Sequence, residues 1–104
     1  MDGLAGEEAR TAAAAYLDEL AHQRRASPLT LESYGHDLAA LLALAGATSL
    51  DKLKHHDIRR FVAQLHARGL SGRSLARALS AWRGFFNWLA KHRGMTQNPC
   101  LAVR

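Results

Sequence analysis

The chain has 104 residues, 48% of them hydrophobic and 22% charged, which is the length and composition of one ordinary globular domain. No apolar run approaches the roughly 20 residues that a membrane span needs, and residues 1–20 lack the basic start, apolar stretch and cleavage site of a secretory signal. Cys100 is the only cysteine, which excludes an internal disulfide and is compatible with a reducing compartment.

The formal net charge of +5 is distributed unevenly along the chain. Residues 1–57 are net acidic, whereas no Asp or Glu follows Asp57. The second half carries nine basic residues, Arg59, Arg60, Arg68, Arg73, Arg77, Arg83, Lys91, Arg93 and Arg104. This division favours a polyanionic partner for the second half, although a basic charge that only keeps a protein soluble explains the count equally well.

Two helices are predicted in the first half of the chain. The first spans about residues 7–25, with glutamates at its start and arginines at its end, which is the order that the helix dipole favours. The second spans about 28–45: Ser27 before Pro28 is a typical helix start, and Gly46 is a typical helix end.

Two further helices are predicted in the second half. A connector with a helical turn near 50–53 leads to a third helix over about 56–68. Ser71 can cap a fourth helix over about 72–92, which Gly94 ends. No strand-like alternation occurs, so the sequence predicts an all-α, four-helix bundle.

The fourth predicted helix has two opposed faces when its residues are placed at about 100° intervals. Its apolar face consists of Leu75, Leu79, Trp82, Phe85, Phe86 and Leu89. The opposite face, here called the polar stripe, consists of Arg73, Arg77, Ser80, Gly84, Asn87 and Lys91, with Arg83 beside it. Because cations repeat there with no carboxylate to pair with them, and short side chains leave room for another molecule, the stripe predicts a surface for duplex DNA.

DNA binding by the polar stripe predicts a dependence of affinity on salt and on Arg77. If Arg73, Arg77, Arg83 and Lys91 each neutralise one phosphate, log affinity should fall against log salt with a slope of about −3.6. Replacement of Arg77 by alanine should weaken binding and leave the helix folded. The alternative function is a helical protein-interaction module that docks its basic helix on an acidic partner.

The N-terminal end of the second predicted helix offers a weaker candidate surface. Thr30, Ser33 and Asp37 lie beside its apolar positions, where hydroxyls and free N–H groups could meet a phosphate. An equally good reading is that these residues are ordinary caps and surface polar residues.

No metal, cofactor or catalytic residue is predicted. His55 and His56 are adjacent, so they cannot share one helix face, and no Cys or His stands at a zinc-like spacing beside them. No nucleophile motif or glycine-rich phosphate loop surrounds any Ser, His or Asp.

Several segments resemble one known family. Residues 73–89 (RSLARALSAWRGFFNWL), followed by Asn-Pro at 98–99, resemble the N-terminal core-binding domain of tyrosine recombinases of the XerC and XerD type, and XerC more than XerD. Residues 27–31 (SPLTL), with Tyr34 and Asp-Leu at 37–38, resemble the second helix of that domain. The similarity covers almost the whole chain.

The resemblance implies a single SAM-like core-binding domain over residues 1–104, followed by a catalytic domain that this chain does not contain. The two domains would clamp a duplex recombination site, in DNA integration and recombination and in the resolution of chromosome dimers before cell division. The implied partners are duplex DNA, the C-terminal catalytic domain and a second, XerD-like subunit, in the bacterial cytoplasm. The catalytic residues belong to the C-terminal domain, so this chain alone should bind DNA and cut nothing.

Carried over by position, the resemblance assigns DNA contacts to the second and fourth helices, at Thr30, Ser33, Arg73, Ser74, Arg77, Ser80 and Arg83. Two positions depart from the commonest pattern of the family. Ala78 stands where a second arginine often follows the first, and Gly84 stands where serine is frequent. Each departure removes one group that could contact a phosphate.

Overall fold

The computed structural model describes residues 4–101 and 103, and all regular structure in those residues is helical. The elements are α1 (Glu7–His22), α2 (Pro28–Ala45), the 3₁₀ turn η1 (Leu50–Lys52), α3 (His55–Ala67) and α4 (Gly72–Arg93). The predicted all-α class is therefore confirmed. Arg104, counted above among the basic residues, lies outside the described residues.

Helix α1 ends at His22, whereas the sequence predicted an end near residue 25. The reason is local backbone geometry. Arg25 adopts a left-handed φ of 53°, and the N–H of Ala26 donates back to the carbonyl of Leu20 at 3.0 Å. These features turn the chain out of the helix before its last arginines.

The two helices that carry the predicted site begin at side-chain caps. The Ser27 hydroxyl accepts the N–H of Thr30 at 3.1 Å, and the Ser71 hydroxyl accepts the N–H of Ser74 at 3.2 Å. Each bond satisfies an N–H that has no partner within its helix. Helix α4 ends at Gly94, whose φ of 70° places it in the left-handed region.

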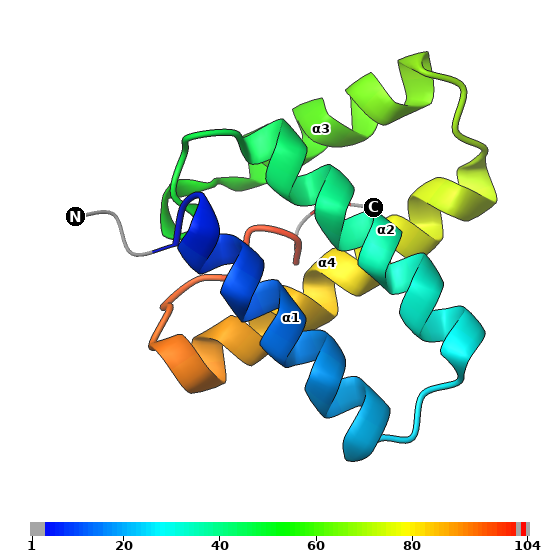
Figure 1. Cartoon of the computed structure of the whole chain (residues 1–104). Coiled ribbons are helices and arrows are strands. Elements are labelled where there is room, and N and C mark those ends of the chain that lie inside the picture. Colours follow the sequence, from blue (N-terminus) through cyan, green and yellow to red (C-terminus); the bar gives the residue numbers. More distant parts are fainter. Residues whose placement is uncertain (1–3, 102, 104) are drawn as a thin grey trace.

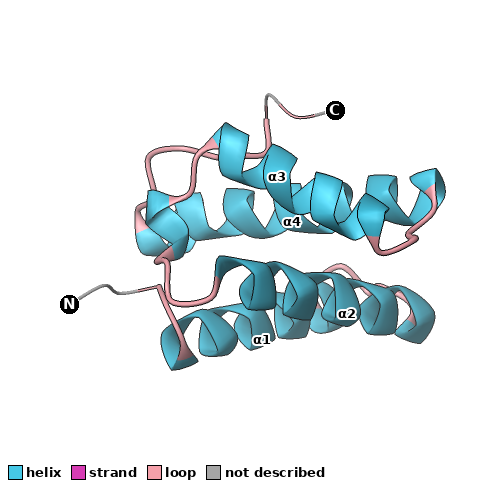
Figure 2. Cartoon of the chain, turned by 90° about the horizontal axis from the view of Figure 1, so that it is seen from above, coloured by secondary structure: helices cyan, strands magenta, loops and turns pink. Residues whose placement is uncertain are grey.

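Helix α4 packs against each of the other three helices, and α2 also packs against α1 (Figure 1). Seen from above, α1 and α2 form one layer and α3 and α4 form the other (Figure 2). The buried face of α4 is the predicted apolar face, and its largest fully buried side chains are Trp82, Phe85, Phe86 and Leu89. Burial of each such side chain stabilises the fold by about 1.5–3 kcal/mol, so the orientation of α4, and with it the polar stripe, is fixed by the core.

Candidate nucleic-acid interface

Arg73 and Ser80 lie on the N-terminal half of α4, and both are exposed. Neither has a hydrogen-bond or ion-pair partner among the described residues. Ser74 is half-buried, and its hydroxyl lies 3.2 Å from that of Ser71 in the helix cap. Of these three predicted contacts, Arg73 and Ser80 are therefore the ones whose polar groups are free to meet a ligand.

Arg77 has a carboxylate partner, which the sequence reading did not anticipate. Its Nε donates to Oδ2 of Asp37 and its Nη2 donates to Oδ1, both at 2.9 Å. These hydrogen bonds, and secondarily the charge of Asp37, raise the pKa of Arg77 above its ordinary value. The expectation that no carboxylate pairs with the cations of the stripe is wrong here, because the acid comes from α2 and the phase of α4 alone cannot reveal it.

Asp37 was expected beside the apolar face of its helix, as a surface residue, and it is instead buried, with 5% of its surface exposed. Helix α2 packs against α4 along this stretch, so Asp37 faces the neighbouring helix rather than solvent. The indole N–H of Trp82 donates to the Asp37 carbonyl at 2.7 Å, which ties the backbone of α2 to the core of α4 at the same point.

A shallow cavity of about 340 Å³ lies between the start of α2 and α4, lined by Leu29, Thr30, Ser33, Tyr34 and Arg77. The structure thus brings together three of the predicted contacts, Thr30, Ser33 and Arg77. The hydroxyls of Ser33 and Tyr34 have no hydrogen-bond partner among the described residues, and that of Thr30 accepts only from Ser27, at 2.9 Å. The cavity therefore presents three hydroxyl groups and one guanidinium to whatever occupies it.

The polar stripe is interrupted at Gly84. From the sequence, the space left by the missing side chain of Gly84 was predicted to admit another molecule. In the structure, the hydroxyl of Tyr16 from α1 occupies this space. A Cβ atom on Gly84 would overlap that hydroxyl. One turn further, the Asn87 side chain accepts a hydrogen bond from the Asn98 side chain at 2.8 Å. In the middle of the stripe, Gly84 and Asn87 therefore contact other parts of the same chain.

Lys91, at the C-terminal end of the stripe, is exposed beside a second cavity of about 440 Å³ between α1 and α4. Glu19 lines this cavity as well, so a carboxylate also lies near this end of the stripe. Its Oε1 accepts the indole N–H of Trp88 at 3.2 Å and lies 3.8 Å from Nε2 of His92. Arg24 lines the same cavity, so this end of the stripe combines two cations with one carboxylate.

Arg83 does not join the cavity between α2 and α4. It is half-buried, and its Nη2 donates to the carbonyl of Val103 at 3.0 Å. The same segment is held by Asn98, whose side chain donates to the Arg83 carbonyl at 3.2 Å and accepts the N–H of Cys100 at 3.0 Å. Arg83 thus anchors the C-terminal segment to α4.

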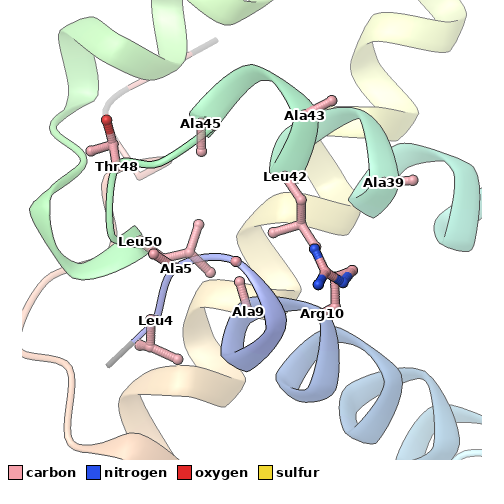
Figure 3. A pocket seen from close by; sticks show the side chains of 12 residues that line it. Leu4, Ala5, Ala9, Arg10, Ala39, Leu42, Ala43, Ala45, Thr48 and Leu50 are labelled. Atoms are coloured by element: carbon pink, nitrogen blue, oxygen red, sulfur yellow. The ribbon is translucent and has the colours of Figure 1, made fainter. Parts of the chain in front are cut away.

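A third cavity, of about 290 Å³, lies between the start of α1 and the end of α2 (Figure 3). Leucine and alanine side chains dominate its lining, and Arg10 is the one charged residue among the described residues that line it. It lies at the opposite end of α2 from Thr30 and Ser33, so it is separate from the candidate interface.

The described residues contain no group of three or more His, Cys, Asp and Glu side chains that could hold a metal ion. Among the same residues, no helix has both the length and the apolar character that crossing a membrane requires.

Tyr34 and Asp37 have roles in this region that the sequence did not predict: Tyr34 lines the cavity, and Asp37, which was predicted beside Thr30 and Ser33, pairs with Arg77. A signal for Asp37 was present: an acidic residue directly before Leu38 and three residues after Tyr34 lies at the edge of the buried face of its helix. A carboxylate at such an edge needs a partner, because burial of an unpaired charge is costly.

Comparison with known proteins identifies the family. The sequence profile of the phage integrase N-terminal SAM-like domain matches residues 13–93. The chain belongs to this family. The four helices of this SAM-like domain, and the absence of strands from its described residues, agree with that assignment.

Similar full-length proteins include tyrosine recombinases XerC. This chain is 53% identical over 96 residues to tyrosine recombinase XerC of Ralstonia pickettii (strain 12J), with 88% of this chain aligned. It is 50% identical over 95 residues to tyrosine recombinase XerC 1 of Ralstonia nicotianae and 40% identical over 92 residues to XerC of Xanthomonas campestris pv. campestris. The chain spans 29% of the length of each of these relatives. No solved structure matches it.

Proposed function

We propose that this SAM-like domain binds duplex DNA, as the DNA-gripping part of a site-specific tyrosine recombinase of the XerC type. In such a protein the domain would position the recombination site, and a C-terminal catalytic domain would cleave and rejoin it. The resolution of chromosome dimers before cell division is the role that we propose for the whole protein, with a second, XerD-like subunit as its partner.

The observation that carries this proposal is the grouping of donors at the junction of α2 and α4. Arg73 and Ser80 are exposed and have no partner within residues 4–101 and 103, and Arg77 meets Thr30 and Ser33 at one cavity. Arginine and hydroxyl side chains are among the groups that contact DNA phosphates. Helices α2 and α4 cross and pack against each other here, so one strand of a duplex could be contacted from both (Figure 1).

The structure changes the expected salt dependence. Asp37 neutralises Arg77, and Arg83 is half-buried and bonded to the Val103 carbonyl, which leaves Arg73 and Lys91 as the exposed cations of the polar stripe. At about −0.9 per phosphate, two contacts predict a log–log slope of about −1.8 in place of −3.6. A fluorescein-labelled duplex of mixed sequence, titrated with the domain at several sodium chloride concentrations, measures this slope.

A matched pair of variants locates the surface. Arg73→Ala and Arg59→Ala remove the same charge, the first from α4 and the second from an exposed position on α3. We expect Arg73→Ala to weaken binding and flatten the slope by about 0.9, and Arg59→Ala to leave both nearly unchanged. Absence of duplex binding, or equal losses in both variants, would contradict the proposal. The rival function, docking on an acidic protein, predicts no preference for duplex DNA over an acidic polypeptide such as poly-glutamate.

A further inference from the structure

Asp37 is the one charged residue buried among the described residues, and both of its carboxylate oxygens are used by Arg77. The two parallel bonds of 2.9 Å leave the guanidinium plane a single orientation relative to α2. The Trp82 bond to the Asp37 carbonyl holds the backbone of α2 in the same place. The orientation of the Arg77 guanidinium is therefore fixed by α2 rather than by α4, the helix that carries Arg77.

The guanidinium keeps unused donors. Nε and one N–H of Nη2 are bonded to Asp37, whereas the N–H groups of Nη1 and the second N–H of Nη2 have no partner among the described residues. The Arg77 side chain is 42% exposed, against 6% for Asp37, and it lines the cavity with Thr30 and Ser33. One edge of the guanidinium is thus fixed by the protein and the other is presented to the cavity.

A contribution to stability does not by itself account for this arrangement. An ion pair that spans a burial boundary adds little to folding, because the carboxylate loses its hydration. A hydrophobic pair at the contact of α2 and α4 would pack there without that cost. The pair instead holds a planar set of donors at the mouth of a cavity where the hydroxyls of Ser33 and Tyr34 have no hydrogen-bond partner among the described residues.

We propose that Asp37 is a positioning residue, which aims Arg77 at one phosphodiester of a DNA strand in the cavity between α2 and α4. The hydroxyls of Thr30 and Ser33 complete the site. This inference rests on the proposed function, because it describes how one of the proposed DNA contacts is oriented. Arg77 then acts through directed hydrogen bonds and adds no net charge to the surface, because the charges of the pair cancel.

The first test compares Asp37→Asn with Glu8→Gln. Both variants raise the net charge by the same amount, and Glu8 is exposed on α1 without a partner among the described residues. Glu8→Gln should bind the mixed-sequence duplex about twofold more tightly than the unmodified domain, because of its added charge. If Asp37 only lowers the local positive charge, Asp37→Asn should also bind more tightly. If it positions Arg77, Asp37→Asn should bind about tenfold more weakly than the unmodified domain, in spite of its added charge.

The salt slope distinguishes loss of position from loss of fold. Without the carboxylate, Arg77 becomes a free cation, so the slope for Asp37→Asn should steepen by about 0.9 while affinity at low salt falls. A variant that bound weakly because it was partly unfolded would show no steeper slope, and its circular dichroism spectrum and thermal unfolding would report the change. Binding by Asp37→Asn equal to or tighter than that by Glu8→Gln overturns the proposal.

Arg77→Lys gives an independent second test, because it keeps the charge and removes the planar fork. We expect about tenfold weaker binding from this variant, and binding equal to that of the unmodified domain overturns the proposal whatever Asp37→Asn does. If Asp37→Asn does not fold, Arg77→Lys decides alone. An unmodified domain that does not bind duplex DNA would contradict the proposed function. Normal binding that is insensitive to both variants would contradict only the role of Asp37.

Discussion

The hydroxyl of Tyr16 on α1 occupies the space that a side chain on Gly84 of α4 would need. The Tyr16 ring cannot withdraw easily, because it is buried and lies against Phe85 and Trp88, with ring centroids 5.6 and 6.0 Å away. Gly84 therefore sets how closely α1 approaches α4. Its place in the polar stripe reflects helix packing rather than contact with a ligand.

Gly84→Ala should have opposite effects on stability in two backgrounds. In the unmodified chain the added methyl group meets the Tyr16 hydroxyl, and such overpacking costs about 1–3 kcal/mol of unfolding free energy. In a Tyr16→Phe background the hydroxyl is absent, and the better helix propensity of alanine should add up to about 1 kcal/mol. Urea unfolding of the four proteins measures both effects. Equal changes in the two backgrounds would contradict the contact.

Arg77→Ala should destabilise the domain as well as weaken DNA binding, in contrast to the expectation from sequence. It leaves the buried Asp37 carboxylate without its partner, at a cost of about 1–3 kcal/mol, reduced from that of a fully buried pair because Arg77 is half-exposed. The double variant Asp37→Leu with Arg77→Met removes both charges and should recover most of that loss. Thermal unfolding is the measurement, and full stability of Arg77→Ala alone would show that the pair is not formed.

The start of α3 predicts an acid-sensitive contribution to stability. The Asp57 carboxylate accepts the N–H of Lys54 at 2.9 Å, and this bond is the main cause that lowers the pKa of Asp57 below its ordinary value of 3.8; a bond from Arg60 adds to it. Because the folded pKa is the lower one, the contribution is present above pH 3.8 and is lost as the pH falls through the folded pKa.

Asp57→Asn should therefore lower the unfolding free energy by about 0.5–1 kcal/mol at neutral pH and should lose less stability than the unmodified chain on acidification. Glu32→Gln, an exposed change on α2, is the control. Urea unfolding at several pH values between neutrality and pH 3 measures the difference. Parallel pH profiles for the unmodified chain and Asp57→Asn would rule out this role for Asp57.

The Cys100 thiol should be inert in the folded protein. It is fully buried, and burial raises its pKa to about 12. The thiolate is the reactive form, so modification by Ellman's reagent at pH 8 should be limited by unfolding or local opening. Asn98→Ala should increase this reactivity, since Asn98 holds the backbone of Cys100 and the carbonyl of Arg83. Rapid modification of the unmodified folded chain would contradict the burial.

The helices could be predicted from the sequence because each signal is local. Caps at Ser27 and Ser71 and the apolar face of α4 depend on residues that are near one another in the chain, and all three are present in the structure. The end of α1 was missed because the left-handed conformation of Arg25 has no marker such as glycine.

The candidate site could be predicted only in part, because its decisive contacts join different helices. Helical phase placed Arg77 and Gly84 on one face, but it could not show that Asp37 of α2 pairs with the first and Tyr16 of α1 covers the second. The hydrogen bond from Arg83 to the carbonyl of Val103 could not be predicted for the same reason. Residues separated by tens of positions are brought together by packing alone.

The most direct test of the central claim is to map the DNA-binding surface by ¹H–¹⁵N NMR spectra of the labelled chain, recorded during titration with a mixed-sequence duplex. We predict that the largest amide shifts cluster at Thr30, Ser33, Arg73, Arg77 and Ser80, and that α3 and the apolar cavity of Figure 3 change little. Shifts centred on α3 or on that cavity, or no shifts at a salt concentration where nonspecific binding should be strong, would contradict a DNA interface at the junction of α2 and α4.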